Sequence, residues 1–582
     1  MTRHVFDIET DGLLDQLTKV HSLVLRDVDT GEVVSCADHA GFTPVCAGLE
    51  AMMLADKIIG HNVIKFDIPA IQKVYPWFEV RKDQVIDTLV YGRLVWPNIS
   101  DTDTKLIHTS RLPGKLRGSH SLKAYGYRLG VLKGEFSNED TDWSTWTPEM
   151  QTYCEQDTEV TLALINKLEE KDYSHMAVEL EHRVAWILAE QERNGFMFNT
   201  DKAEKLLSTL QQKRAAIEDE LQDIFPPIVT ERYSEKTGKR LKDGVEVFNP
   251  GSRIQVVKRL ADRYGWEPEH YTEKGQPKID ETILSKLPYP EAQKIAEYFM
   301  LQKRIGQIAE GKYGWLNLVG DDGRIHGSVN TIGAVTGRMT HMYPNVAQVP
   351  SVGKPYGAEC RELFCVPKGK KLVGIDVSGL ELRMLAHFMK DAEYTRELLE
   401  GDIHTANQKA AGLDERSQAK TFIYAFLYGA GDAKIGSIVG KGSKAGKELK
   451  NRFLARTPAL GGLLSRVSKA AKRGFLVGLD GRKLHVRHQH AALNTLLQSA
   501  GALVCKRWIV ELEDALIENN YADHVKFVAN VHDEVQLEVD EWFAEKVGEL
   551  AVECIARAGT YFNVRVPLTG EYNIGDNWKE TH

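Results

Sequence analysis

The stretch NVHDEVQLEV, residues 530–539, carries charged residues at a turn where most proteins place glycine. Apolar residues alternate with others on both sides of this turn, over 525–539, which is the period of two strands that each bury one face. A tight turn between such strands ordinarily carries Asn-Gly or Asp-Gly. Here it carries His532, Asp533 and Glu534. Because adjacent carboxylates repel each other, the pattern indicates a cationic partner at this turn.

A further acidic residue ends another predicted strand. KKLVGIDVSGLELRMLAHF, residues 370–388, begins as a buried strand, reaches Asp376 and continues into a helix. Mixed sheets commonly hold ligands at the carboxyl ends of their strands. If this strand pairs with the hairpin, Asp376 lies beside Asp533 and Glu534, and a divalent cation between them removes the repulsion. For the hairpin alone, an exposed turn whose acids face water is the alternative interpretation.

A stripe of two cations and two aromatic residues lies between these elements. In RSQAKTFIYAFLYGAG, residues 416–431, the side chains of Arg416, Lys420, Tyr424 and Tyr428 are spaced four residues apart. On a helix this spacing gives one slowly drifting face. Arg and Lys can hold triphosphate oxygens and Tyr can stack on a base. The stripe therefore predicts a nucleotide-binding face, whereas an aromatic stripe without the cations would be core.

Residues 1–170 contain a second set of acids. Asp7 and Glu9 stand two apart on a predicted strand, which places them on one face. Asp67, in HNVIKFD, and Asp157, in YCEQD, complete four carboxylates, with Tyr153 one helical turn before Asp157. Any one of them alone is an ordinary surface acid. Together they suit two divalent cations about 4 Å apart, which can activate water and stabilise the leaving oxygen of a phosphodiester.

The predicted elements divide the chain into three parts. Residues 1–170 alternate strands and helices, 175–310 are mostly helical around an exposed polar segment at 231–244, and the rest is mixed. A chain of 582 residues is too long for one core, so several domains are expected. The seven scattered cysteines contain no CxxC pair, which favours reduced thiols in the cytosol. No segment predicts a signal peptide or a membrane span.

Positive charge is concentrated in one window. Although the net charge is −8, residues 434–487 carry fourteen Lys or Arg against only Glu448 and Asp480. A solvated surface and an electrostatic track for phosphates both fit this window. Charge alone does not decide between them.

The motifs together resemble a known enzyme family. DVSGLELR, RSQAKTFIYAFLYG and VHDE match, in order, the three polymerase motifs of family A DNA polymerases. The ordered trio DxE, HNxxxFD and YxxxD resembles DEDD-type 3′→5′ exonucleases of the branch with Tyr in the last motif. The resemblance covers nearly the whole chain. Segments such as GAVTGRMTHMYPNVAQVP and HAALNTLLQSAGAL are most similar to replicative polymerases of short-tailed, T-odd-type phages.

The resemblance implies a multidomain α/β and α+β fold. An RNase H-like exonuclease domain is expected to precede a right-hand polymerase with helical thumb, helical fingers and an antiparallel-sheet palm. The implied boundaries are 1–172 for the exonuclease, 173–320 for the helical linker and thumb, 321–390 for the first part of the palm, 391–477 for the fingers and 478–582 for the second part of the palm.

The resemblance also implies roles at the polymerase site. Asp376 and Asp533 are expected to bind the catalytic metal pair, with Glu534 as an accessory acid. Lys420 is the expected proton donor to pyrophosphate and Glu381 excludes a ribose 2′-OH. The implied nucleotide contacts are Arg416, Lys420, Tyr424, His404, Glu381 and Tyr428, and the implied primer–template contacts are Arg338, Gln348, Gln498 and His532.

For the exonuclease, the resemblance implies Asp7, Glu9, Asp67 and Asp157 as metal ligands and Tyr153 as the residue that orients the attacking water. Asn62 fits either a substrate contact or a structural amide. Two Mg²⁺ ions per active site are expected, and Mn²⁺ can substitute. The implied partners are primer–template DNA and dNTPs, in the cytoplasm of an infected bacterium, with a phage helicase–primase as a candidate and no membrane.

Close phage relatives recruit host thioredoxin through a long basic insertion in the thumb. About fifty residues separate Asn194-Gly195 from FNPGSR, residues 248–253, which leaves no room for that insertion. Thioredoxin is therefore not an expected partner. Two other functions remain open from the sequence: an exonuclease whose decayed polymerase half only binds DNA, and a non-catalytic replication scaffold. The intact Asp376, Lys420 and Asp533 argue against the first, and eight intact acidic and basic catalytic positions argue against the second.

Overall fold

The computed structural model describes residues 2–131, 141–272 and 274–582. The chain divides into two compact units. Unit 1 comprises Met1–Asn194, Ser328–Met342 and Val373–Ile574, and unit 2 comprises Gly195–Gly327, Tyr343–Leu372 and Gly575–His582. Among the helices of the described ranges, none is both long and apolar enough to cross a membrane. Both predicted sets of carboxylates lie in unit 1.

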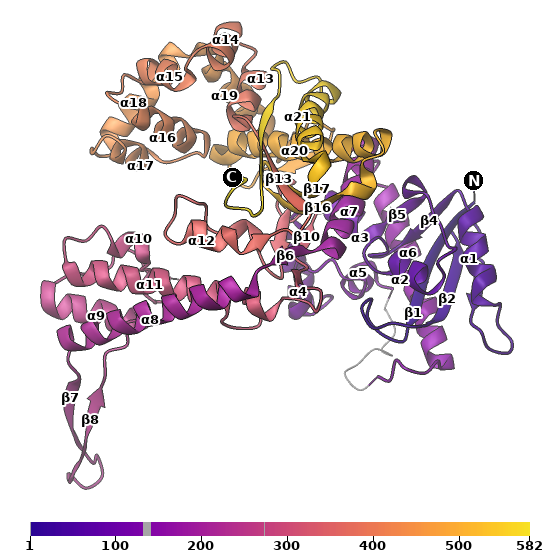
Figure 1. The fold of residues 1–582 in the computed structure, drawn as a ribbon, viewed down its shortest axis with the longest axis horizontal. Coiled ribbons are helices and arrows are strands. Elements are labelled where there is room, and N and C mark those ends of the chain that lie inside the picture. The colour runs from indigo at the N-terminus through magenta and orange to yellow at the C-terminus, as the bar shows by residue number, and fades with distance from the viewer. Residues whose placement is uncertain (1, 132–140, 273) are drawn as a thin grey trace. The chain divides into compact units, whose positions relative to one another are not determined.

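A five-stranded sheet with helices on both faces forms the amino-terminal part of unit 1 (Figure 1). Its elements are β1 (Arg3–Thr10), β2 (Val20–Asp27), β3 (Val33–Cys36), α1 (Val45–Leu54), β4 (Lys57–Gly60), α2 (Asp67–Val74), β5 (Val85–Asp87), α3 (Thr88–Val95), α4 (Ile99–His108), α5 (Leu122–Leu129) and α6 (Pro148–Glu169). The strand order is β3-β2-β1-β4-β5, with β1 antiparallel to β2 and parallel to β4. Side chains alternate along β1, so Phe6 joins the core of α1 and α2 whereas Val5 joins the core of α6.

Helix α6 begins at the residues that the sequence predicts. The side chain of Thr147 accepts a hydrogen bond from the backbone N–H of Met150, and Pro148 occupies the first turn. The helix packs along β1, where the thiol of Cys154 donates to the carbonyl oxygen of Asp7 at 3.3 Å. The alternation of strands and helices predicted for residues 1–170 is confirmed.

A four-stranded sheet forms the carboxy-terminal part of unit 1. Its strands are β13 (Lys370–Val377), β16 (Val525–Val531), β17 (Glu534–Asp540) and β18 (Gly570–Gly575), in the order β16-β17-β13-β18. The predicted pairing of the 370–376 strand with the terminal hairpin is confirmed. Helices α20 (Ala492–Glu518) and α21 (Ala544–Tyr561) pack against each other, and the buried indole N–H of Trp508 donates to the carbonyl oxygen of Ala551 at 2.8 Å.

Helices and two short ribbons complete this part of unit 1. The helices are α13 (Leu380–Met389), α14 (Ala392–Glu400), α15 (Ile403–Ala411), α16 (Arg416–Leu427), α17 (Asp432–Ser437), α18 (Ser443–Arg456) and α19 (Pro458–Ala471), and the ribbons are β10 (Ser328–Asn330) with β11 (Thr340–Met342) and β14 (Phe475–Val477) with β15 (Lys483–His485). Phe422 of α16 packs edge-on against Phe453 of α18 inside this core. The inner face of α16 is therefore apolar, which turns its cationic and tyrosine stripe outward.

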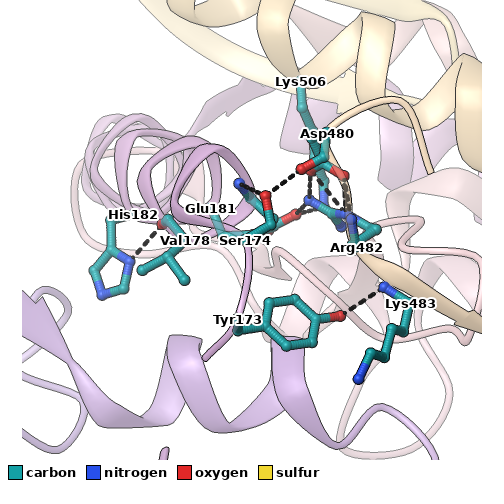
Figure 2. Close-up of polar contacts among 10 residues, drawn as sticks. Tyr173, Ser174, Val178, Glu181, His182, Asp480, Arg482, Lys483 and Lys506 are labelled. Carbon is teal, nitrogen blue, oxygen red and sulfur yellow. Dashed lines mark hydrogen bonds and ion pairs between the residues drawn. The ribbon is translucent and has the colours of Figure 1, made fainter. Parts of the chain in front are cut away.

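Helix α7 (His175–Asn194) is joined to the β14–β15 ribbon and to α20 by a buried cluster of charges (Figure 2). The Oε1 atom of Glu181 receives Nζ of Lys506 and a guanidinium nitrogen of Arg482, each at 2.6 Å. Arg482 also pairs with Asp480 at 2.7 Å. All four side chains are at most 2% exposed. Part of the basic window is thus neither solvated surface nor phosphate track, because Arg482 and Asp480 lie in this cluster.

Unit 2 is mainly helical. Its elements are β6 (Phe196–Phe198), α8 (Thr200–Ile224), β7 (Ile228–Tyr233), β8 (Arg240–Glu246), α9 (Arg253–Tyr264), α10 (Glu281–Leu284), α11 (Pro290–Ile308), β9 (Arg324–Ile325), α12 (Gly357–Glu362) and β12 (Phe364–Cys365). Helices α8 and α11 pack together, and β12, β6 and β9 form a small sheet. The polar segment 231–244 falls in an exposed antiparallel hairpin of β7 and β8, which projects from the helices of this unit (Figure 1).

Candidate active sites

The carboxy-terminal cavity is a hollow of about 480 Å³ lined by both Asp376 and Asp533. The structure therefore brings together two acids that are 157 positions apart in the chain. Other residues singled out from the sequence line the same cavity: Arg338, Glu381, Tyr424, Tyr428, Gln498 and His532.

A two-residue turn between β16 and β17 presents Asp533. His532 adopts a positive φ of 59°, and Val531 pairs directly with Glu534 across the turn. The carbonyl oxygen of Asp533 accepts a hydrogen bond from the backbone N–H of Val377 at 3.1 Å. This bond ties the turn to the residue that follows Asp376.

Burial sets the electrostatics of the turn. It raises the pKa of Asp533, and the neighbouring charge of Glu534 raises that pKa further, whereas His532 and Arg338 act in the opposite direction. Glu534 is itself buried, and one of its carboxylate oxygens accepts from Nε2 of Gln536 at 2.7 Å. The carboxylate charge of Asp533 is thus incompletely compensated by the protein, as at a cation site.

Glu381 organises the aromatic wall of the carboxy-terminal cavity. The hydroxyl of Tyr428 donates to Oε1 of Glu381 at 2.5 Å, and a guanidinium nitrogen of Arg338 lies 3.8 Å from the same carboxylate. Burial together with the charges of Glu381 and Asp533 raises the pKa of Tyr424. Both tyrosines of the α16 stripe therefore lie against acids of this site.

The cationic half of the stripe is exposed. Arg416 forms a two-point ion pair with Asp402, at 2.6 and 3.0 Å, and Lys420 is exposed on the same helix. The rings of His404 and Tyr424 are 6.4 Å apart, and burial with the charges of Arg416 and Lys420 lowers the pKa of His404. Asp402 was not singled out from the sequence, although its N-cap position in GDIHTANQ is a recognisable signal.

Of the four predicted DNA contacts, Gln348 is the one that does not line the carboxy-terminal cavity. It belongs to unit 2 and ends a short helical turn, Val346–Gln348. Its carbonyl oxygen accepts a hydrogen bond from Nε2 of Gln307 at 3.0 Å.

The amino-terminal acids form a second, separate cluster. Ligand atoms of Asp7, Glu9 and Cys154 lie within 4.8 Å of one another. Asp67 is buried, and its pKa rises to about 7 because of burial and the charges of Asp87 and Asp157. Asp67 and Asp157 lie close enough to act on each other's charge, but of the four predicted carboxylates only Asp7 and Glu9 belong to the group within 4.8 Å. Cys154 joins that group, and burial raises the pKa of its thiol.

Asp87 holds the loop that precedes Asp67. Its carboxylate accepts from the backbone N–H groups of Asn62 at 2.9 Å and Ile64 at 3.1 Å, and its own N–H donates to Nε2 of His182 at 2.9 Å. Asn62 has a positive φ of 68°, so these bonds stabilise an uncommon backbone conformation. The sequence signal for Asp87 is an acid between a strand and a helix in VIDTLV.

The amino-terminal cavity, about 780 Å³ in volume, opens beside these acids. Asp7, Asn62 and Asp157 line it. So do Arg93 of α3 and Asn330 of the β10–β11 ribbon, two residues that the sequence analysis did not single out.

Both clusters suit a divalent cation. Each brings buried and half-buried carboxylates to one place, and carboxylate oxygens are the donors that Mg²⁺ and similar ions prefer. In each, like charges and burial raise a carboxyl pKa, as expected where the protein alone does not neutralise the charge.

Comparison with known proteins agrees with these sites. The model of the family "DNA polymerase family A" matches residues 229–580, and the chain belongs to this family. It is a DNA-directed DNA polymerase, and divalent metal ions are the cofactors of its family. In particular, it is similar to the DNA-directed DNA polymerases of Enterobacteria phage T3 and Escherichia phage T7. Each is 40% identical over 704 aligned positions, which cover 99% of this chain and 100% of the relative.

A solved structure matches the whole fold. The POL domain of Pol1 from M. smegmatis, in complex with DNA primer-template and dNTP, superposes with a TM-score of 0.75. The match covers 99% of this chain and 96% of that chain at 20% sequence identity. The mixed α/β multidomain fold is confirmed.

Proposed function

We propose that this polymerase extends primers through the carboxy-terminal cavity and proofreads through a 3′→5′ exonuclease at the amino-terminal cavity. The observation that carries the proposal is the presence of two separate carboxylate clusters in unit 1, each facing its own cavity. One cluster suits nucleotidyl transfer and the other suits phosphodiester hydrolysis, because both reactions need charge neutralisation at phosphorus.

At the polymerase site, Asp376 and Asp533 would hold two Mg²⁺ ions, or Mn²⁺ in their place, and Glu534 supports them. When bound, such ions activate the primer hydroxyl and neutralise the triphosphate. Arg416 and His404 bind triphosphate oxygens, which requires Arg416 to exchange its partner Asp402 for phosphate. Lys420 delivers a proton to the departing pyrophosphate.

The remaining cavity residues select and place the substrates. Tyr424 stacks on the incoming base, and Tyr428 lies beside the templating base. Glu381, held by Tyr428, blocks a ribose 2′-OH and so favours deoxynucleotides. The proposed contacts to the minor groove of the primer–template, which read little sequence, are Arg338, Gln348, Gln498 and His532.

At the exonuclease site, Asp7, Glu9, Asp67 and Asp157 would hold the metal pair. Its chemistry is the activation of water and the stabilisation of the leaving oxygen. Tyr153, buried one turn before Asp157 on α6, orients that water. The domain boundaries that we propose are those implied by the sequence: 1–172, 173–320, 321–390, 391–477 and 478–582.

Primer extension and primer shortening test the two sites together. With Mg²⁺ and dNTPs the chain is expected to extend a primer, and without dNTPs it is expected to shorten it. The double variant Asp7→Ala/Glu9→Ala is expected to lower shortening by about 10³-fold or more, because the metal ligands on β1 are lost, while extension continues. Unchanged shortening by this variant would contradict the assignment of the amino-terminal site.

The exonuclease with a decayed polymerase half is not favoured. Its distinguishing result is normal shortening with no extension. Asp376 and Asp533 line one cavity, which gives the polymerase half the acids that catalysis requires.

The basic window is proposed to guide template phosphates. Lys469 lies in the last turn of α19, and Lys472 and Arg473 follow the end of that helix. Reversing these three charges to Glu is expected to weaken primer–template binding. It should also flatten the plot of log K against log salt by about 3 in slope, near 0.9 for each phosphate that the variant no longer binds. The same substitutions at three exposed lysines outside the basic window, Lys115, Lys205 and Lys546, provide the control for charge alone. Equal slopes for both triple variants would contradict a specific track.

The polymerase is also proposed to work without thioredoxin. The alignment with the phage relatives spans 704 positions against 582 residues in this chain, so the relatives carry segments that this chain lacks. Adding purified thioredoxin is expected to leave the length of extension products unchanged. A large increase in product length on single-primed circular DNA would show that the chain binds thioredoxin through another surface.

The cellular setting is proposed from the same similarity. The enzyme would act on primer–template DNA and dNTPs in the cytoplasm of an infected bacterium. A phage helicase–primase is a candidate partner, and capture from infected cells with the tagged chain would identify it.

A further inference from the structure

The β10–β11 ribbon belongs to both cavities. Its residues Asn330 and Thr340 line the amino-terminal cavity, together with Asp7 and Asp157. His341 of the ribbon and Arg338, in the loop between its two strands, line the carboxy-terminal cavity. This short ribbon comes much later in the chain than the amino-terminal sheet, yet it lines the same cavity as Asp7 and Asp157.

Arg93 is the cation that meets this ribbon inside the amino-terminal cavity. Its Nη1 donates to Oδ1 of Asn330 at 2.7 Å. The guanidinium carries five N–H donors, and within the described ranges no other hydrogen bond or ion pair of this side chain is seen. Partial burial lowers the pKa of Arg93, opposed by the charge of Asp87. The cavity that Asp7 and Asp157 line therefore also contains a partly desolvated cation with unused N–H donors.

Lys65 has a different role at the same ribbon. Its Nζ donates to Oγ of Ser328 at 2.9 Å and to the carbonyl oxygen of Val329 at 3.2 Å, and it pairs with Glu192 at 2.6 Å. All three ammonium donors are used, so Lys65 tethers the ribbon to the loop before Asp67. Arg93, by contrast, keeps donors for a ligand.

We infer that Arg93 and Asn330 form a phosphate-binding subsite for the single-stranded 3′ end of DNA in the exonuclease cavity. This inference rests on the proposed exonuclease function. A guanidinium matches two phosphate oxygens with parallel N–H groups, and the Asn330 amide, accepting from Arg93 through Oδ1, has its Nδ2 donors for a third oxygen. Such a cation offsets the repulsion between a polyanion and the acids that line the cavity.

The subsite makes the exonuclease cavity composite. Arg93 comes from α3 of the amino-terminal part, whereas Asn330 comes from the ribbon that also carries Arg338 toward the polymerase cavity. The ribbon is held to the amino-terminal part by both Arg93 and Lys65. Removing Asn330 therefore weakens the grip on a 3′ end even though all four exonuclease acids remain.

A binding measurement on single-stranded oligonucleotides tests the subsite without catalysis. The background is the full chain with Asp7→Ala/Glu9→Ala, and the probes are oligothymidylates with one neutral methylphosphonate at the first, second or third linkage from the 3′ end. Arg93→Ala is expected to weaken binding of the all-phosphate probe about 10-fold or more, as for the removal of a charged hydrogen bond. On the probe neutralised at the contacted linkage, that penalty is expected to fall below about 2-fold.

Matched variants separate a phosphate contact from a structural role. Arg81→Ala removes the same charge from an exposed residue outside the cavity lining and is expected to show no linkage dependence. Lys65→Met is expected to weaken all probes equally. Asn330→Asp, which introduces a negative charge, is expected to weaken binding more than Asn330→Ala. If Arg93→Ala does not fold, Arg93→Lys replaces it as the test. Lysine keeps the charge but lacks the two parallel N–H groups of the guanidinium, so a smaller loss of binding is expected, at the same linkage.

A penalty that is the same on every probe, or no penalty, would overturn the subsite. Failure of the exonuclease itself gives a different result. A wild-type chain that leaves primers intact without dNTPs overturns the proposed exonuclease function. A wild-type chain that shortens primers, with an Arg93 penalty that no neutral linkage removes, overturns only the subsite.

Discussion

Replacing Asp533 with Asn is expected to reduce primer extension by about 10³-fold or more, the upper range for the loss of one electrostatic partner of a transition state. The amide is nearly isosteric, so the turn and its bond to Val377 should persist. What is lost is a negative charge in a cavity where Asp376 alone cannot neutralise two dications. Single-turnover nucleotide incorporation measures the effect, and primer shortening without dNTPs is expected to continue.

The control for this variant lies on β17, the strand that follows the turn. Asp540 ends β17 and hydrogen-bonds to Nδ1 of His524 at 2.7 Å, outside the cavity lining. Asp540→Asn makes the same chemical change and is expected to leave extension within about 2-fold, as for a substitution away from the site. If both variants lose primer extension equally, the loss comes from changing any Asp of this hairpin to Asn, and the proposed role of Asp533 as a metal ligand is contradicted.

The sequence predicts the polymerase half of the site through strand alternation. The period of two in 525–539 and the apolar run before Asp376 are both sheet signals, and they place the acids at adjacent strand ends. The four-residue spacing of the α16 stripe predicts its outward face for the same reason. These features are local periodicities that burial enforces, so one sequence is sufficient to find them.

Other residues are defined only by tertiary contacts. Arg93 and Asn330 are 237 positions apart and neither belongs to a recognisable pattern. The β7–β8 hairpin was missed as a pair of strands because its exposed faces lack apolar alternation. Arg482 looked like one more cation of a basic window, and only its contacts with Glu181 and Asp480 show that it is buried.

Replacing Glu181 with Gln is expected to destabilise the chain by about 3–5 kcal/mol, the usual loss when one member of a buried ion cluster is removed. Glu181 receives both Lys506 and Arg482, and Figure 2 shows these cations converging on α7 from two other segments. Without Glu181, Asp480 faces two buried positive charges. Denaturant unfolding of the wild-type chain and the variant measures this loss in the free energy of unfolding.

The pH dependence of that loss identifies its cause. Burial lowers the pKa of Lys506 to about 8 from an ordinary value of 10.5. In the variant, Lys506 has lost its anionic partner Glu181, and it can avoid a buried unpaired charge by releasing its proton when the chain folds. Relative to the unfolded chain, losing this proton costs about 5 kcal/mol at pH 7 and about 3.5 kcal/mol at pH 8, a change of about 1.4 kcal/mol per pH unit. The unfolded state then binds the extra proton, so the variant regains stability as pH rises from 7 to 8.

Two further variants decide whether charge or packing is responsible. Glu190→Gln alters an exposed acid on the same helix and is expected to change stability by less than about 0.5 kcal/mol. Glu181→Leu with Lys506→Met removes one anion and one cation, leaves Asp480 with Arg482, and is expected to recover most of the loss because an apolar pair replaces an ion pair. If the double variant is instead as unstable as Glu181→Gln, the shape of the Glu181 side chain, and not its charge, joins α7 to the β14–β15 ribbon and α20.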